Sequence, residues 1–222
     1  MKKSTIALVA VAFAAFATQA NTTSANIVGY VKDTGNVGFH IANYAFTSSD
    51  TSPQGVFGSQ MPLGTKVYTF DGSGYSISEY KSVFSFETFT NVDQWEPNTL
   101  DLSGANGFWI ENASGSPVES IMSGEVITDA AVTNVIGAGF NLVADPYPVS
   151  SSISDLDFSP AIGDKVYTFD GSTYTISEYK SVFSFETFTN VDQWEPEIQV
   201  AVGQGFWYET TTPQTWVRVK PF

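Results

Sequence analysis

Short runs in which large apolar residues alternate with small polar ones recur along the chain and predict β-strands. Residues 67–70 are β-branched and aromatic, and residues 75–80 alternate large with small polar residues, as a half-buried strand does. Between these two runs, Asp71 and Gly72 are a strong turn signal, because this pair tolerates positive φ in a tight turn. The pattern predicts a β-hairpin here, and a second hairpin over 166–179, where the same residues recur.

The remaining segments predict more short strands and almost no helix. Residues 83–90, 107–111 and part of 115–121 are strand candidates, and 91–97 is expected to be a loop. One helical turn is expected over 152–158, which opens with N-cap chemistry. Six or seven short strands in each unit favour an all-β fold of two tandem antiparallel β-sandwich or barrel-like repeats.

An internal repeat is the strongest signal in the chain. Residues 66–97 and 165–196 differ at only two positions, Gly74 against Thr173 and Ser76 against Thr175. Such self-similarity at a fixed offset indicates two copies of one structural unit.

The similarity continues outward more weakly, through a GF segment at 38–41 and a GFW segment at 107–111. We therefore divide the chain into a signal peptide over 1–20, a first β repeat over 21–124 and a second over 125–222. Two explanations for the near-identity of the central block stay open. Gene conversion makes the two copies of a segment alike without any functional cause. Alternatively, both copies make the same kind of contact, and that contact requires the same residues in each copy.

The N-terminal residues predict export. Lys2 and Lys3 precede an apolar run over 6–17, and the small residues Thr18 and Ala20 provide a cleavage site. The apolar run is too short to span a bilayer, so a membrane anchor is the weaker interpretation. We expect a secreted, extracellular or cell-surface protein, with the periplasm as an alternative, and no membrane span in the mature chain.

Composition excludes several kinds of chemistry and of partner. The chain has no Cys, which excludes disulfides, thiolate metal sites and Cys catalysis. Its formal net charge of -14 argues against nucleic acid as a partner, since phosphates repel such a surface. Aromatic residues make up 15% of the chain, which fits strands with half-buried faces.

Several motifs together resemble a known kind of protein. They are Gly139-Phe140-Asn141-Leu142, the segment from Gly64 to Gly72, Gly205-Phe206-Trp207, and the closing segment from Trp216 to Phe222. In these the chain resembles secreted two-repeat β-proteins of the planctomycete–verrucomicrobial type. The resemblance implies the fold and export, and it carries no activity.

The sequence contains no complete set of catalytic residues. His40 is the only His, and its counterpart in the second repeat is Asn141, so a His-based triad or general base is not expected. Paired carboxylates leave a glycoside hydrolase as a weaker alternative. Its candidate residues are Glu79, Glu87, Asp93 and Glu96, repeated as Glu178, Glu186, Asp192 and Glu195.

No cofactor is expected, although calcium is a candidate ligand because hard cations prefer oxygen donors. The candidate calcium ligands are Asp71, Asp93, Glu96, Asp170, Asp192 and Glu195. No spacing among them matches a calcium loop, and Asp-Gly is also an ordinary turn pair.

A carbohydrate-binding protein with two sites is the main alternative function, since exposed aromatic rings stack on sugars. The candidate rings form two like sets, Tyr75, Tyr80 and Trp95, and Tyr174, Tyr179 and Trp194. Trp95 is expected to be the best exposed of them, because polar residues surround it. The opposing interpretation places these aromatics in the core.

Assembly is the leading hypothesis. Residues Ile27, Val28, Gly29, Tyr30 and Val31 form a short strand that pairs either with a neighbouring subunit or within its own unit. Duplicated surfaces also suit self-association or binding to other surface proteins. We therefore expect a non-catalytic, exported structural or assembly protein, such as a surface, matrix or filament subunit.

Overall fold

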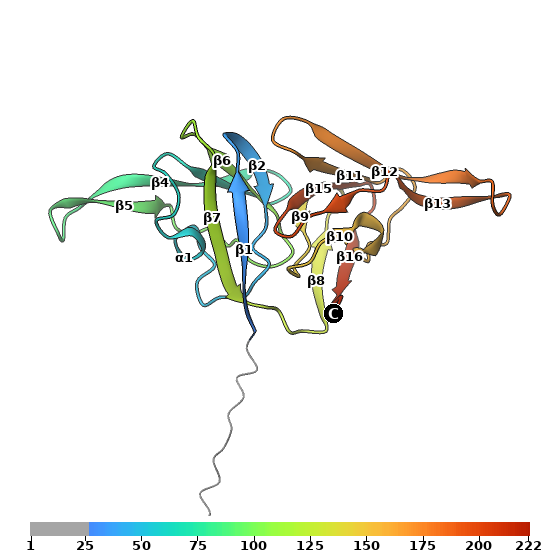
Figure 1. The fold of residues 1–222 in the computed structure, drawn as a ribbon, viewed down its shortest axis with the longest axis horizontal. Coiled ribbons are helices and arrows are strands. Elements are labelled where there is room, and N and C mark those ends of the chain that lie inside the picture. Colours follow the sequence, from blue (N-terminus) through green and yellow to red (C-terminus); the bar gives the residue numbers. More distant parts are fainter. Residues whose placement is uncertain (1–26) are drawn as a thin grey trace, which may run out of the picture.

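The computed structural model describes residues 27–222, so the expected signal peptide lies outside the described residues. The fold is all-β, and it consists of two similar antiparallel halves that follow one another along the chain (Figure 1). Among residues 27–222, no helix is long and apolar enough to cross a membrane.

Each half contains one five-stranded antiparallel sheet and one separate pair of strands. In the first half the sheet has the order β2-β6-β3-β4-β5, and β1 pairs with β7. Its elements are β1 (Val28–Gly35), β2 (Gly38–Ala42), α1 (Pro53–Phe57), β3 (Lys66–Phe70), β4 (Tyr75–Ser85), β5 (Thr90–Glu96), β6 (Phe108–Asn112) and β7 (Val118–Glu125).

The second half repeats this arrangement. Its sheet has the order β9-β15-β11-β12-β13, β8 pairs with β16, and a small β10–β14 pair is added. Its elements are β8 (Ala131–Ile136), β9 (Gly139–Ala144), β10 (Ser151–Ser152), the 3-10 turn η1 (Ile153–Asp155), β11 (Lys165–Phe169), β12 (Tyr174–Ser184), β13 (Thr189–Glu195), β14 (Gln199–Val200), β15 (Gly205–Thr210) and β16 (Gln214–Val219).

The predicted hairpins form as the turn chemistry requires. The N–H of Asp71 donates to the carbonyl of Gly74 at 3.2 Å, and the Asp71 carboxylate accepts the N–H of Ser73 at 2.8 Å. Gly72 has φ of 94°, a left-handed conformation that glycine adopts without steric cost. The short helix α1, which starts at Pro53 after an N-cap Ser52, was not expected from the sequence, although Ser-Pro is a helix-start signal.

The expected strand over 83–90 and the expected loop over 91–97 are wrong. The strand β4 continues without interruption to Ser85, and β5 returns along it, leaving only residues 86–89 as the turn. Val83 lies opposite Val92, and Phe84 opposite Asn91. Polar residues of the expected loop therefore find backbone partners along the extension of β4, which local composition does not reveal.

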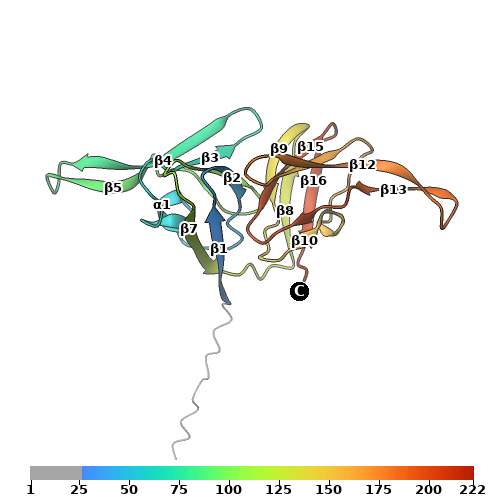
Figure 2. The same ribbon diagram turned by 45° about the horizontal axis from the view of Figure 1, so that its top comes forward.

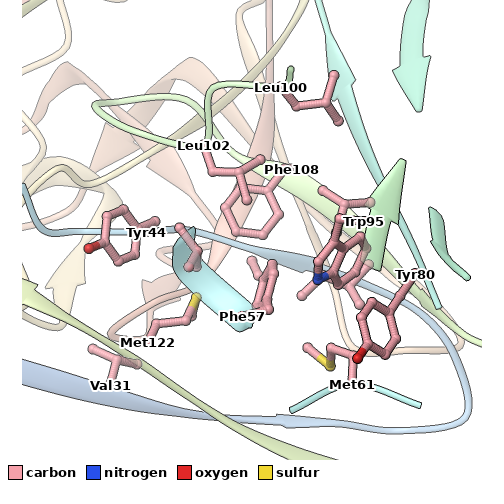
Figure 3. Close-up of a cluster of buried hydrophobic side chains, with 14 of the residues drawn as sticks. Val31, Tyr44, Phe57, Met61, Tyr80, Trp95, Leu100, Leu102, Phe108 and Met122 are labelled. Atoms are coloured by element: carbon pink, nitrogen blue, oxygen red, sulfur yellow. The ribbon is translucent and has the colours of Figure 1, made fainter. Parts of the chain in front are cut away.

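One face of each sheet packs on its strand pair to form a core. In the first half the core includes Phe57, Tyr80, Trp95 and Met122 (Figure 3). In the second half, Trp194 and Trp216 belong to the equivalent cluster. These two clusters contain most of the buried hydrophobic residues of the described chain, and burial of apolar surface is the main favourable contribution to folding.

The halves join through reciprocal contacts, as an approximate two-fold axis requires. The N–H of Asn43 donates to the carbonyl of Gly203 at 2.8 Å, and the N–H of Ala144 donates to the carbonyl of Ala105 at 3.0 Å. A Cβ added to Gly205 would lie 3.1 Å from the Cα of Gly107. The glycines of the two GFW segments thus permit close approach of the backbones at this junction.

Two long hairpins extend from the body in opposite directions, β4–β5 from the first half and β12–β13 from the second (Figures 1 and 2). We refer to these hairpins as the arms. They lie at the two ends of the longest axis in Figure 1, and the near-identical blocks 66–97 and 165–196 contain both of them.

Candidate functional site

The tips of the arms present apolar rings to solvent. Phe86 is 81% exposed and Phe89 is 76% exposed, and Phe84 packs edge-on against Phe86 with ring centroids 5.2 Å apart. The second arm repeats this geometry at Phe183, Phe185 and Phe188. Exposed clusters of large apolar side chains mark interaction sites more often than single exposed residues do.

The backbone at each tip is held in an unfavourable conformation. Phe89 has φ of 54° and Phe188 has φ of 55°, in the left-handed region where a bulky residue is an outlier. Strain of this kind costs on the order of 1–3 kcal/mol and is concentrated at functional sites. Both arms retain a Phe at this position, and the strained turn projects its ring outward.

Replacing Phe89 by Asn is expected to leave the free energy of unfolding unchanged or to raise it by about 1 kcal/mol, because Asn tolerates the left-handed region and the lost ring is exposed. Urea unfolding of the purified protein measures this change. The same substitution at Phe84, which has ordinary backbone geometry, is the control and is not expected to be stabilising. A loss above about 1 kcal/mol in Phe89→Asn would show that the ring supports the fold.

A second surface lies on the outer faces of the two sheets, where they meet. Tyr75 alternates along β4 with the core-facing Ser78 and Tyr80, so it points away from the core. We call this the aromatic surface. Its rings form five equivalent pairs, Phe39 and Phe140, Tyr68 and Tyr167, Phe70 and Phe169, Tyr75 and Tyr174, and Trp109 and Trp207. The two tryptophans are largely buried at the base of this surface, in a small cluster with Ile41 and Leu142.

Ring contacts cross the junction between the halves in both directions. Phe70 of the first half meets Trp207 at a centroid distance of 5.1 Å, and Phe169 of the second half meets Trp109 at 5.3 Å. Both contacts are edge-to-face, the arrangement that aromatic pairs prefer. The aromatic surface therefore belongs to both repeats, and neither repeat forms it alone.

The central tyrosines, Tyr75 and Tyr174, are partly buried among the other rings. Tyr75 lies against Phe70 at a centroid distance of 5.1 Å, and Tyr174 lies against Phe169 at 4.9 Å. Partial burial raises the pKa of both tyrosines above its ordinary value. Both hydroxyls therefore stay protonated at neutral pH and are able to donate a hydrogen bond.

Carboxylates lie at the rim of the aromatic surface. The hydroxyl of Tyr68 donates to Glu111, and that of Tyr167 donates to Glu209. Burial, followed by the bond to Glu209, raises the pKa of Tyr167 to about 12. Lys66 Nζ lies 3.5 Å from Glu111 Oε2. These carboxylates therefore already have partners within the protein.

Two shallow hollows open on the aromatic surface, with volumes of about 400 and 490 Å³. They share Tyr75, Trp109 and Tyr174 as lining residues, so they adjoin across the junction. Volumes of roughly 300–1,000 Å³ are usual for small-ligand sites.

The six rings that were expected to bind sugars lie in two different environments, some exposed and some buried. Tyr75 and Tyr174 are half-exposed on the aromatic surface. Tyr80, Trp95 and Trp194 are buried, and Tyr179 packs against the second core. The expectation that Trp95 is exposed was wrong, because its strand lies over α1 and its ring enters the core. Trp109 and Trp207, which are not among the rings predicted to bind sugars, also line the hollows, and the GFW segments are the sequence signal that locates them.

The expected calcium ligands are not gathered at one place. Within residues 27–222, no group of three Asp, Glu or His side chains is close enough to hold a metal ion. Asp71 and Asp170 accept the backbone N–H groups of their own turns, which lowers their pKa. Asp93 and Glu96 lie three residues apart on β5, and Asp192 and Glu195 likewise on β13, so strand alternation places the members of each pair on opposite faces.

The carboxylates of the hydrolase alternative are also spread along the arms. Glu79 lies opposite Glu96, and Glu178 opposite Glu195, near the base of each arm. Glu87 and Glu186 lie in the turns at the tips. The tip carboxylates are thus separated from the others by several strand residues.

Residues 28–31 of the strand expected over 27–31 form part of β1, which pairs with β7 of its own half, Val31 lying opposite Met122. Its interpretation as a segment that joins another subunit therefore loses its main support. The carboxylate of Asp33 on β1 accepts a hydrogen bond from His40 Nε2 at 2.9 Å, and in the second repeat the side-chain oxygen of Asn141 accepts the N–H of Gly137 at 2.9 Å. Each of these two residues therefore connects its strand to the segment that precedes it.

Neither a protein-family model nor a curated protein nor a solved structure matches the chain. Two features of the molecule are candidate interaction sites, the apolar tips of the arms and the aromatic surface between the repeats.

Proposed function

We propose that this protein is a non-catalytic, exported assembly subunit whose arms join copies end to end at a cell surface, in a matrix or in a filament. One observation carries the proposal, namely that two arms of nearly identical sequence end in the same exposed Phe cluster at opposite ends of the molecule. Export rests on the sequence of the first twenty residues.

Besides its apolar tip, each arm has a strand edge. The strands β5 and β13 are the last strands of their sheets, so the β5 and β13 sides of the arms are edges to which a further strand can add. At the base of the first arm this edge is capped, since the N–H of Trp95 donates to the side chain of Gln54. The N–H groups of Asp93 and Asn91 point the same way by strand alternation, beyond the reach of that cap.

The positions of the arms determine the kind of assembly. A contact between two arms is self-complementary, because each arm presents the same surface. One molecule has such a surface at each end, so pairing at one end leaves the other free (Figure 1). Arm-to-arm pairing therefore builds an open chain of subunits.

Three variants test the proposal by size-exclusion chromatography with light scattering. In the first-arm variant Phe86→Ser is combined with Phe89→Asn, in the second-arm variant Phe185→Ser with Phe188→Asn, and the third combines all four substitutions. The unaltered protein is expected to form concentration-dependent polymers. Each one-arm variant is expected to stop at a dimer, and the four-fold variant to remain a monomer.

Val135→Thr is the matched control, because Val135 is an exposed apolar residue on β8 outside both arms. It is expected to polymerise as the unaltered protein does. Polymers that persist in the four-fold variant, or an unaltered protein that stays monomeric at high concentration, would contradict arm-to-arm assembly. Polymerisation of both one-arm variants would show that each arm binds a different surface of its neighbour.

A further inference from the structure

A polar pocket of about 360 Å³ adjoins the aromatic surface on one side. It shares Phe70 and Phe140 with the larger hollow, so the pocket adjoins the hollows, and we refer to the three together as the groove. Its other lining includes Asp71, Asn106 and Asn134. The groove thus has an apolar floor at the junction of the repeats and polar side chains at one end.

The polar end has hydrogen-bonding groups that the protein does not use. Asn106 accepts a hydrogen bond from Asn134 at 3.3 Å through its Oδ1, and its Nδ2 donates to no group among residues 27–222. Asp71 uses Oδ1 for its turn, and its Oδ2 accepts no hydrogen bond from the described residues. A donor and an acceptor therefore line the pocket without a protein partner.

The two hairpin turns have different neighbours across the junction. A Cβ added to Gly171 would lie 3.8 Å from the side chain of Asn36, whereas a Cβ added to Gly72 would meet nothing within 4 Å. The Asn36 side chain therefore lies beside the turn of the second repeat, and no side chain of the described residues lies as close to Gly72 in the first. The space beside Gly72 is the polar pocket.

We propose that this groove binds a neutral carbohydrate chain, with sugar rings stacked on Tyr75 and Tyr174 and the chain end held by Asn106 and Asp71. A sugar ring has apolar C–H faces and hydroxyls at its edge, which match an aromatic floor beside unpaired donors and acceptors.

A neutral ligand fits this groove better than a cation. Aromatic hollows also bind quaternary ammonium groups, which favour a nearby carboxylate without a partner. Here Glu111 and Glu209, the carboxylates beside the rings, already accept the hydroxyls of Tyr68 and Tyr167. Asp71, whose Oδ2 is unpaired among the described residues, lines the polar pocket and neither of the aromatic hollows. The free amide of Asn106 is a donor, which suits a hydroxyl oxygen and does not suit a cation.

The site differs from the two separate sites that the sequence suggested, since both repeats contribute rings to one groove. It is also independent of the proposed assembly, because the arm tips do not line it. The four-fold arm variant is therefore expected to bind carbohydrate as the unaltered protein does.

Isothermal titration of the four-fold arm variant with hexasaccharides of β-glucan, xylan and mannan tests the proposal. At least one is expected to bind at about millimolar or lower concentration. Adding Tyr75→Ala and Tyr174→Ala is expected to weaken that binding by about tenfold or more, the usual effect of removing central aromatic contacts. Asn106→Ala, at the polar end, is expected to weaken it separately by several-fold, about the value of one hydrogen bond.

Tyr30→Ala is the matched control, since Tyr30 is an exposed tyrosine on β1 and lines neither the hollows nor the polar pocket. It is expected to leave binding unchanged. The proposal is overturned if no neutral hexasaccharide binds, or if Tyr75→Ala with Tyr174→Ala leaves the affinity intact while thermal unfolding is unchanged. It is also overturned if choline binds in place of the sugars, or if the tyrosine substitutions in the unaltered background abolish polymerisation, which would make a second copy the occupant.

Discussion

Replacing Arg218 by alanine is expected to lower the free energy of unfolding by about 3–5 kcal/mol, because it leaves a buried carboxylate without its partner. Arg218 is 3% exposed and Asp145 is 4% exposed. The guanidinium donates through Nη2 to Asp145 at 2.9 Å and through Nη1 to the backbone carbonyl of Asp155 at 2.7 Å. A buried charge that loses its ion pair keeps the full cost of desolvation.

In the first repeat, uncharged residues occupy the positions equivalent to Arg218 and Asp145. Arg218 lies opposite Val132 on β8, and Met122 lies opposite Val31 at the equivalent position on β1. Met122 belongs to the first apolar core, as does Tyr44, which occupies the position of Asp145. The double variant Asp145→Tyr with Arg218→Met is therefore expected to recover most of the stability that Arg218→Ala loses, because a packed apolar pair replaces a buried ion pair.

Urea unfolding followed by tryptophan fluorescence measures these changes. The control is Lys32→Ala, which removes an exposed ion pair with Glu119 and is expected to change stability by less than about 1 kcal/mol. A loss in Arg218→Ala no larger than that of the control would contradict the prediction. It would mean that water enters and solvates Asp145 when the guanidinium is removed.

Replacing Trp95 by alanine is expected to destabilise the first repeat by about 3–5 kcal/mol, the usual cost of a large cavity in a core. Trp95 is 2% exposed, and its ring lies 5.6 Å from that of Phe57 and 5.5 Å from that of Tyr80 (Figure 3). Its indole N–H donates to the carbonyl of Gly58 at 3.1 Å. The substitution removes the packing and leaves that carbonyl without its donor.

This loss of stability affects the interpretation of sugar-binding experiments, because a loss of binding in Trp95→Ala would reflect unfolding of the first repeat. Trp194→Ala is expected to act in the same way on the second core, to which Trp194 belongs. Tyr75→Ala is the control on the same hairpin, and it is expected to cost about 1 kcal/mol or less because half of its side chain is exposed. Comparable losses in Trp95→Ala and Tyr75→Ala would contradict the prediction.

Part of the candidate site was predictable from the residues. The turn at Asp71 and Gly72 follows from local chemistry, and the hairpin that it closes forms as expected. Tyr75 and Tyr174 were selected as rings able to bind a ligand, and both lie on the aromatic surface. Trp95 has the same kind of polar neighbours in sequence, but alternation along β5 turns its ring to the core and turns the neighbouring Glu96 outward.

The arms were harder to predict because polar residues such as Asn91 and Asp93 give a strand the composition of a loop. The segment pairs because β4 runs beyond the sheet and offers it backbone partners. The aromatic surface was also beyond local prediction, since Phe70 and Trp207 come from different repeats. Their contact depends on how the two halves pack against each other.

The sequence by itself determined that this is an all-β protein of two like repeats, because turn chemistry and strand alternation are local properties of the chain. It also showed that residues 66–97 and 165–196 are nearly identical, either because both copies make the same contact or because gene conversion kept them alike. The tertiary structure alone decided that these segments form arms at opposite ends and that both repeats build one aromatic groove. The physical reason is that burial and exposure of a ring depend on which distant strand covers it, and the order of residues along one strand does not contain that information.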